Sequence, residues 1–303
     1  MIWLLFILIT AMAVSYLLAH FTLAPFADRK AISPGQFVRL QDGETHFEWH
    51  GPARGPIIVC IHGLTTPSYV FTPLIPLLID QGYRVLTYDL YGRGGSDRVE
   101  GDQTREFFMR QLRELLASQG ITDRVTLLGY SMGGALAVAR AVEAPDTVNR
   151  LILLAPAGLG VEMGRFYTLA SRLPVLGDWM MEVLGPLMVY WKYSRTTTDD
   201  PFEEKINGLI RNDMRVEGTL EAVLSSQRNF LSEAMAEDHL LVAKMGIPLL
   251  VMWGELDTTI PVEALSSLQK INPKARHVVF DWADHRMPYL WPDDIAAAIE
   301  ANL

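Results

Sequence analysis

One short segment, residues 125–135, constrains this chain more than any other part of it. Its first half, ending at Tyr130, is an apolar run typical of a buried strand, and its last residues begin an Ala- and Leu-rich run typical of a helix. Ser131 therefore lies on a sharp turn, where Gly129 and Gly133 allow strand and helix to approach closely. Gly-x-Ser-x-Gly in this context predicts a nucleophile elbow, which exposes the serine hydroxyl and directs the next backbone N–H at a developing oxyanion.

Other short apolar runs also end in residues suited to catalysis. These runs, with the residues that follow them, are 57–61 with His62 and Gly63, 83–88 with Asp89, Gly92, Gly94 and Ser96, 247–254 with Glu255 and Asp257, and 275–280 with Asp281, Asp284 and His285. In open α/β sheets, sites form beyond the carboxyl ends of the strands. We therefore expect these residues to gather near the elbow serine.

In these motifs the chain resembles the α/β-hydrolase family over residues 36–301, apart from a long middle insertion. The resemblance rests on chain order: His-Gly, Asp-x-x-Gly-x-Gly-x-Ser, the elbow serine, then an aspartate and a histidine. It implies an α/β fold, with a mostly parallel sheet of about eight strands flanked by helices. It also implies roles for five residues: Ser131 as nucleophile, His285 as general base, Asp257 as orienting carboxylate, and the N–H groups of Leu64 and Met132 as oxyanion hole.

Each of these assignments has a competitor. Glu255 shares the loop of Asp257, although the family's Gly-x-x-Asp spacing from Gly254 favours Asp257. Asp281 and Asp284 flank His285 too closely to reach its Nδ1 in the usual geometry. Six other histidines compete as the base: His46, His50 and His277 in strand-like runs, His239 in a helical stretch, His20 in the first apolar segment, and His62, which the resemblance implies shapes the oxyanion loop.

The chemistry follows from the residue types. A serine hydroxyl needs a base that titrates near neutral pH, which histidine supplies, and a carboxylate fixes the histidine tautomer. Such a set needs no metal and no organic cofactor. Haloalkane dehalogenases and epoxide hydrolases of similar fold place aspartate at the elbow, whereas this chain has Ser131. Acyl transfer from esters, thioesters or lactones is therefore favoured.

Composition restricts the class of protein further. A chain of 303 residues, half of them hydrophobic, is long enough for one large α/β core. Its net charge of −9, without a basic cluster, argues against binding nucleic acid. The single cysteine, Cys60, lies within an apolar run and is expected to be a buried apolar group.

The first segment predicts a membrane anchor over residues 1–27. Residues 2–18 carry no charge, and with the softer continuation through residue 26 the segment reaches the length of about twenty residues that spans a bilayer. A cleaved signal peptide is the alternative, but nothing basic precedes the apolar run and Pro25-Phe-Ala27 is a poor cleavage site. Arg29, Lys30 and Arg39 follow the span, which favours a cytoplasmic catalytic domain.

The remaining chain divides at the insertion. We expect a first core part at 28–158, a helical cap at 159–246 and a second core part at 247–303. A short linker at 31–35 precedes a hairpin over 37–50 with Asp-Gly at its turn, and residues 104–118 have the periodicity of an amphipathic helix. The apolar residues of 166–193 are expected mostly to pack the cap onto the core and partly to line an acyl pocket.

Three functions are compatible with these patterns. The first is a membrane-anchored serine hydrolase for apolar carboxylic esters, of acylglycerol or lysophospholipid type, with a cap that faces the membrane. The second is a C–C bond hydrolase of the aromatic-degradation type, for which Arg165, Arg172 or Arg195 would hold a substrate carboxylate. The third is a non-catalytic binding protein on a hydrolase fold, which the complete Ser/His/Asp set opposes. The sequence leaves the oligomeric state open.

Overall fold

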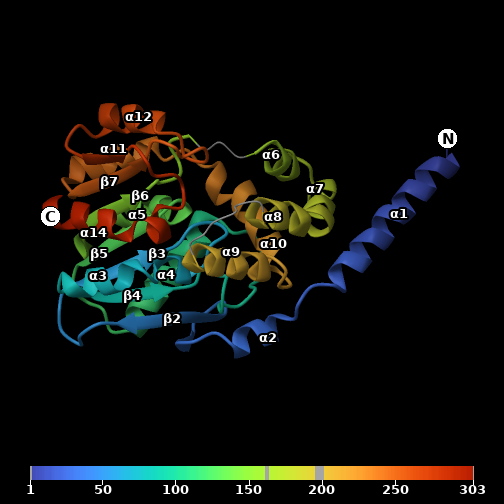
Figure 1. The fold of residues 1–303 in the computed structure, drawn as a ribbon, viewed down its shortest axis with the longest axis horizontal. Coiled ribbons are helices and arrows are strands. Elements are labelled where there is room, and N and C mark those ends of the chain that lie inside the picture. Colours follow the sequence, from blue (N-terminus) through green and yellow to red (C-terminus); the bar gives the residue numbers. More distant parts are fainter. Residues whose placement is uncertain (1, 161–163, 195–200, 303) are drawn as a thin grey trace.

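The computed structural model describes residues 2–160, 164–194 and 201–302, and its centre is an eight-stranded sheet (Figure 1). The strand order is β1-β2-β4-β3-β5-β6-β7-β8. Strands β3 to β8 run parallel, and β1 and β2 add an antiparallel pair at one edge, as the hairpin pattern predicts. The strands are β1 (Gln36–Arg39), β2 (Glu44–His50), β3 (Ile57–Ile61), β4 (Arg84–Tyr88), β5 (Val125–Tyr130), β6 (Val148–Leu154), β7 (Leu249–Gly254) and β8 (Arg276–Phe280).

The core lies on both faces of the central strands, because β3, β5 and β7 consist of almost entirely buried residues. Helices pack against the sheet in two groups, α3 with α14, and α4 with α5, α11 and α12. Their bounds are α3 (Leu74–Asp80), α4 (Arg105–Ser118), α5 (Met132–Glu143), α11 (Ala236–Met245), α12 (Glu263–Ile271) and α14 (Pro292–Asn302). Shorter elements are η1 (Ser68–Phe71), η2 (Pro145–Thr147), η4 (Phe230–Ser232) and α13 (Met287–Leu290).

Helix α4 illustrates how local sequence produces these elements. Thr104 caps it by accepting a hydrogen bond from the Phe107 N–H at 3.3 Å. Phe108, Leu112 and Leu115 recur every three or four residues and are buried against the core, as the periodicity predicts. A fixed start and a single apolar stripe therefore determine both the position and the orientation of the helix.

Between β6 and β7 the chain forms a series of helices on the side of the molecule that also carries α1 (Ile2–His20) (Figure 1). They are α6 (Arg165–Arg172), α7 (Leu176–Trp179), η3 (Met180–Leu184, a π-helix), α8 (Gly185–Ser194), α9 (Pro201–Asp213) and α10 (Thr219–Arg228). We call these six elements the cap helices. The last helix of the insertion, α11, packs against α5 and α12 instead.

Helix α1 is long and apolar enough to cross a membrane, with a mean hydropathy of 2.4 and no buried residue. It ends at His20, so the continuation expected through residue 26 is not part of the helix. Pro25 lacks an N–H and disfavours helical backbone at the residue before it. Ala24 instead forms a β-bridge with Val216, between α9 and α10, and a short helix α2 (Phe26–Ala31) follows.

Candidate active site

Ser131 connects the end of β5 to the first residue of α5 in a backbone conformation that serine rarely adopts. Its φ of 54° and ψ of −118° cost about 1–3 kcal/mol, which the surrounding packing must offset. A Cβ on Gly129 would lie 2.4 Å from the Gly133 carbonyl oxygen, and one on Gly133 would lie 2.0 Å from the Ile61 carbonyl oxygen. The two elbow glycines are therefore required by the close approach of β3, β5 and α5.

The structure brings the serine, histidine and aspartate into one hydrogen-bonded row. His285 Nε2 lies 3.1 Å from Ser131 Oγ, and His285 Nδ1 lies 2.7 Å from Asp257 Oδ2. The other oxygen of Asp257 accepts the N–H groups of Thr259 and Ile260 at 2.8 and 2.9 Å. The Asp257 side chain is fully buried and the His285 side chain is 21% exposed. The carboxylate is thus fixed in place, while part of the imidazole is accessible to solvent.

The competing carboxylates lie elsewhere. Glu255 and Asp281 are exposed to solvent. Asp284 is bound by Arg286, whose guanidinium contacts it at 2.6 Å and also pairs with Glu203 of α9. Of the four candidate carboxylates, Asp257 is the one that the fold brings to His285 Nδ1.

The loop after β3 approaches the elbow, where an oxyanion hole requires it. A Cβ on Gly63 would lie only 3.2 Å from the Ser131 Cβ. Within the described ranges, neither the Leu64 N–H nor the Met132 N–H donates to another group of the protein. Met132 is the first residue of α5, so its N–H also carries the positive end of the helix dipole. Both donors assigned from the sequence are therefore available to a ligand.

His62 has a structural position behind this loop. The Leu90 N–H donates to its Nε2 at 2.9 Å, so Nδ1 carries the proton and donates to the Gly63 carbonyl at 2.7 Å. Complete burial lowers the pKa of His62 to about 4. His62 is therefore neutral and hydrogen-bonded through both ring nitrogens, so it holds the loop in place and is not free to transfer protons.

Arg93, to which the sequence analysis assigns no role, is a fully buried cation beside the same loop. Its Nε donates to the Leu64 carbonyl at 3.0 Å, and its Nη2 donates to the Ala222 carbonyl and to Ser226 Oγ of α10 at 3.2 and 2.8 Å. Gln103 accepts a further hydrogen bond. No carboxylate pairs with Arg93 in the part of the chain that the structure describes. Burial lowers its pKa to about 9.

The remaining histidines lie away from the elbow serine. His46 pairs with buried Asp89 at 2.8 Å, and this partner raises the pKa of His46 although burial alone would lower it. His50 and His277 contact Thr87 and Trp253, and burial lowers the pKa of both histidines. His239 is fully buried in α11, and burial lowers its pKa to about 4. His20 Nδ1 lies 3.3 Å from Glu182.

Tyr130 contacts His285, the residue predicted to be the base, in two ways. Its hydroxyl donates to the His285 backbone carbonyl at 2.7 Å, and its ring centroid lies 5.1 Å from the imidazole. Burial raises the pKa of Tyr130 well above its usual range, so the hydroxyl remains a donor. An apolar strand run that ends in tyrosine directly before the serine is the only sequence signal for this residue.

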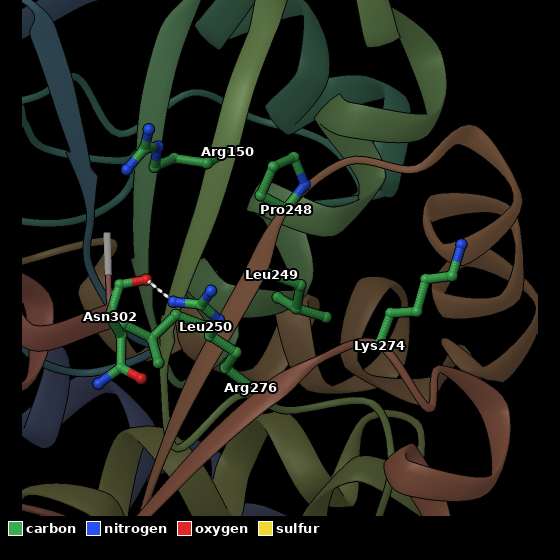
Figure 2. A pocket seen from close by; sticks show the side chains of 7 residues that line it. All are labelled: Arg150, Pro248, Leu249, Leu250, Lys274, Arg276 and Asn302. Carbon is green, nitrogen blue, oxygen red and sulfur yellow. Dashed lines mark hydrogen bonds between the residues drawn. The ribbon is translucent and has the colours of Figure 1, made fainter.

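A cavity of about 350 Å³ lies at the other end of the sheet, where β7 and β8 begin. Figure 2 shows Arg150, Lys274 and Arg276 around it, with the Arg276 guanidinium bonded to the Asn302 carbonyl. Because Ser131 follows the carboxyl end of β5, this cavity is at the opposite edge from the elbow. Elsewhere in the described residues, no group of three or more His, Cys, Asp or Glu side chains is placed to hold a metal ion.

Two features define the molecule as an α/β-hydrolase: a mostly parallel sheet with a helical insertion, and a serine elbow at the carboxyl end of strand β5. The family described as serine aminopeptidase, S33, matches residues 52–287, which includes every strand from β3 to β8. The chain belongs to that family.

Curated and solved proteins agree with this placement. The chain is 27% identical to Lipase 1 of Psychrobacter immobilis over 78% of this chain and 73% of that protein. It is 27% identical to the 2-hydroxy-6-oxononadienedioate/2-hydroxy-6-oxononatrienedioate hydrolase of Cupriavidus pinatubonensis, over 82% and 88% of the two chains. A thermophilic esterase from Thermogutta terrifontis is similar in structure, with a TM-score of 0.72 and 25% identity over 88% of this chain and 97% of that one.

Two of the three cap arginines considered for a substrate carboxylate are on the surface. Arg165 and Arg172, at the two ends of α6, are both exposed. Arg195 lies outside the described residues. Neither described arginine is a buried cation of the kind that would hold a dienoate carboxylate.

Proposed function

We propose that the chain is a serine hydrolase that cleaves carboxylic esters through an acyl-enzyme on Ser131. The proposal rests on two contacts of His285: its Nε2 lies 3.1 Å from Ser131 Oγ, and its Nδ1 lies 2.7 Å from Asp257 Oδ2. Both distances suit proton transfer from a serine to an imidazole held by a buried carboxylate. Membership of a serine hydrolase family supports the same assignment.

The geometry supports a two-stage reaction. Ser131 Oγ attacks the ester carbonyl carbon while its proton passes to His285 Nε2, and the N–H groups of Met132 and Leu64 bind the oxyanion that forms. The C–O bond to the alcohol then breaks, and the alcohol leaves with the proton from Nε2. Water, deprotonated by His285, attacks the acyl-enzyme, and the acid is released as Oγ regains a proton. Asp257 keeps Nδ1 protonated and stabilises the imidazolium.

For the substrate we propose apolar esters of acylglycerol or lysophospholipid type. The cap helices are rich in large apolar residues, and the similarity to a lipase supports an acyl chain as ligand. We assign residues 28–158 and 247–303 to the core and 159–246 to the cap. We further propose that residues 1–27 anchor the protein in a membrane, since α1 has the length and hydropathy of a span.

We place the catalytic domain on the cytoplasmic side of that membrane. Arg29, Lys30 and Arg39 directly follow α1, and basic residues close to a span favour the cytoplasmic side. A glycosylation-site or protease-protection scan of the full chain tests this orientation. Protection of the catalytic domain in sealed inside-out vesicles would contradict it.

A C–C hydrolase is the second candidate, because the chain is as similar to the dienedioate hydrolase as to the lipase. The exposed positions of Arg165 and Arg172 disfavour it. Labelling by a fluorophosphonate, lost in Ser131→Ala, tests for the nucleophile in either case. A series of p-nitrophenyl esters of increasing chain length, compared with a dienoate substrate, then separates the two. Turnover of the dienoate alone would refute ester hydrolysis.

A further inference from the structure

The second half of α1 does not project freely but lies against the cap. The Trp179 indole N–H donates to Ser15 Oγ at 2.9 Å, and His20 contacts Glu182 of η3 at 3.3 Å. The partly buried residues of this half share one helical face: Met12, Ser15, Tyr16 and Ala19. The helix therefore docks on η3 along about two turns.

The other faces of the docked half remain apolar and exposed. Val14, Leu17 and Leu18 expose 48%, 54% and 62% of their surface. The window of 18 residues that gives α1 its mean hydropathy of 2.4 extends into this half. Contact with the cap therefore leaves most of the apolar surface of the helix without a protein partner, as expected for a helix surrounded by lipid.

The length of α1 then sets the depth of the cap. A helix of 19 residues rises about 28 Å, close to the hydrocarbon thickness of about 30 Å. If α1 crosses the bilayer, its docked half lies within one leaflet. η3, which contacts that half, must then lie at or below the headgroup level of the same leaflet.

The cap presents an apolar surface beside this contact. Elements α7, η3 and α8 follow one another without a break from residue 176 to residue 194. Helix α8 and the residue before α7 carry large apolar side chains that are 42–78% exposed. We call these residues the cap face: Val175, Leu187, Met188, Tyr190 and Trp191. The neighbouring Asp178 is paired with Arg228 at 2.6 Å, while Arg165 and Arg172 of α6 are exposed cations that suit anionic headgroups.

We propose that the cap face is immersed in the leaflet that contains the docked half of α1, so that acyl substrates reach the cap directly from lipid. The inference rests on the proposed membrane anchoring by α1. The occupant of the surface is lipid, because α8 directly continues η3, the element that α1 contacts, and α1 itself needs lipid. Tyr190 and Trp191 are also of the types enriched at bilayer interfaces. The cap is thereby held at a fixed depth by Ser15, Trp179 and the His20–Glu182 contact.

Depth-dependent quenching tests the proposal on the full chain. A fluorescent thiol label is placed at Leu5→Cys in α1, at Met188→Cys in the cap face and at Glu237→Cys, an exposed position of α11. Native Cys60 stays in place because it is fully buried. The protein is reconstituted in phosphatidylcholine vesicles with and without nitroxide-bearing acyl chains. We expect strong quenching at 5 and 188 and none at 237.

The outcomes separate the two proposals. Quenching at 5 but not at 188 would overturn immersion of the cap face and leave the anchor intact. Absence of quenching at both positions would overturn the anchor itself, and ester hydrolysis would stand independently. Quenching at 237 as strong as at 188 would show nonspecific adsorption and would also overturn the proposal.

A paired substitution adds a functional readout. In Leu187→Ser/Met188→Ser, we expect hydrolysis of a long-chain ester carried in vesicles to fall about tenfold relative to a soluble acetate ester, because two large apolar side chains are lost from the lipid contact. Leu240→Ser, which alters an apolar residue of α11 that is 40% exposed, is the matched control. Equal ratios in both variants would contradict immersion of the cap face.

Discussion

Arg93 Nε donates a hydrogen bond to the Leu64 carbonyl oxygen at 3.0 Å, in the peptide next to an N–H assigned to the oxyanion hole. The same guanidinium binds the Ala222 carbonyl and Ser226 Oγ on α10. One buried side chain thus connects a cap helix to the loop that we propose forms part of the oxyanion hole.

Replacing Arg93 with Met should lower kcat for a soluble ester by about tenfold to a hundredfold with little change in KM, because the Leu64 peptide loses its support and shifts. Arg98→Met is the matched control: Arg98 is also largely buried and binds Gly94, Ser96 and Thr219, but not Leu64. Steady-state kinetics on both variants, with unfolding measured in parallel, checks the expectation. Equal losses of kcat in the two variants would mean that Arg93 acts only through stability.

Asp257→Asn should lower kcat by about four orders of magnitude while leaving the fold intact. The amide would donate to Nδ1 instead of accepting from it, so the histidine would present the wrong tautomer to Ser131. Glu255→Gln, an exposed change in the same loop, should leave kcat within twofold of the native value, about the scatter of a neutral surface substitution. Near-normal turnover in Asp257→Asn would show that the acid lies elsewhere.

Gly133→Ala should abolish activity and most of the soluble folded yield, since its Cβ would lie 2.0 Å from the Ile61 carbonyl oxygen. Backbone surrounds this position, so no side chain can move to make room. Gly208→Ala in α9 is the control, where the nearest atom to the new Cβ is 3.7 Å away, and it should stabilise the helix by up to about 1 kcal/mol. Thermal unfolding of the two variants compares them directly. A folded, active Gly133→Ala protein would show that the elbow is looser than described.

Stability should fall as the pH drops from about 6.5 to 4. Burial lowers the pKa of both His62 and His239 to about 4, so in this window the unfolded chain binds protons that the folded chain does not. Each histidine contributes up to about 3 kcal/mol, present above pH 6.5 and lost on acidification. His46 has the opposite sign: its pKa is raised, so its contribution is present below 6.5 and lost as pH rises through its folded pKa.

Denaturant unfolding at a series of pH values measures how steeply the free energy of unfolding changes with pH. His239→Leu should reduce that slope. That variant should also be more stable near neutral pH by about 1–3 kcal/mol, because neither ring nitrogen of His239 has a hydrogen-bond partner among the described residues. An unchanged slope in His239→Leu would mean that this imidazole is solvated in the folded protein.

The parts of the fold that depend on local pattern could be predicted from the sequence. The strand that ends at Tyr130, the helix capped by Thr104 and the hairpin around Gly43 each follow from residues within a few positions of one another. The proximity of Ser131, Asp257 and His285 followed from chain order and from the rule that sites gather at the carboxyl edge of a parallel sheet.

The features that the sequence could not predict depend on contacts between residues far apart in the chain. Arg93 meets Ser226 across 133 positions, and Ser15 meets Trp179 across 164, so no local period marks either pair. A charged residue between two glycines is also the usual composition of a solvated loop. The point at which α1 ends also depends in part on such a contact: the apolar run continues beyond His20, but Ala24 forms a bridge with Val216 and Pro25 follows it.

The bridge between Ala24 and Val216 determines where a truncated chain without α1 should begin if it is to be crystallised. Ala24 exchanges backbone hydrogen bonds with Arg215 and Glu217, and Arg29 pairs with buried Asp213 at 2.5 Å. A truncation placed after residue 27 would strip the bridge from the turn between α9 and α10. A recombinant chain that begins just after His20 would lack the apolar helix α1 and keep the bridge between Ala24 and Val216.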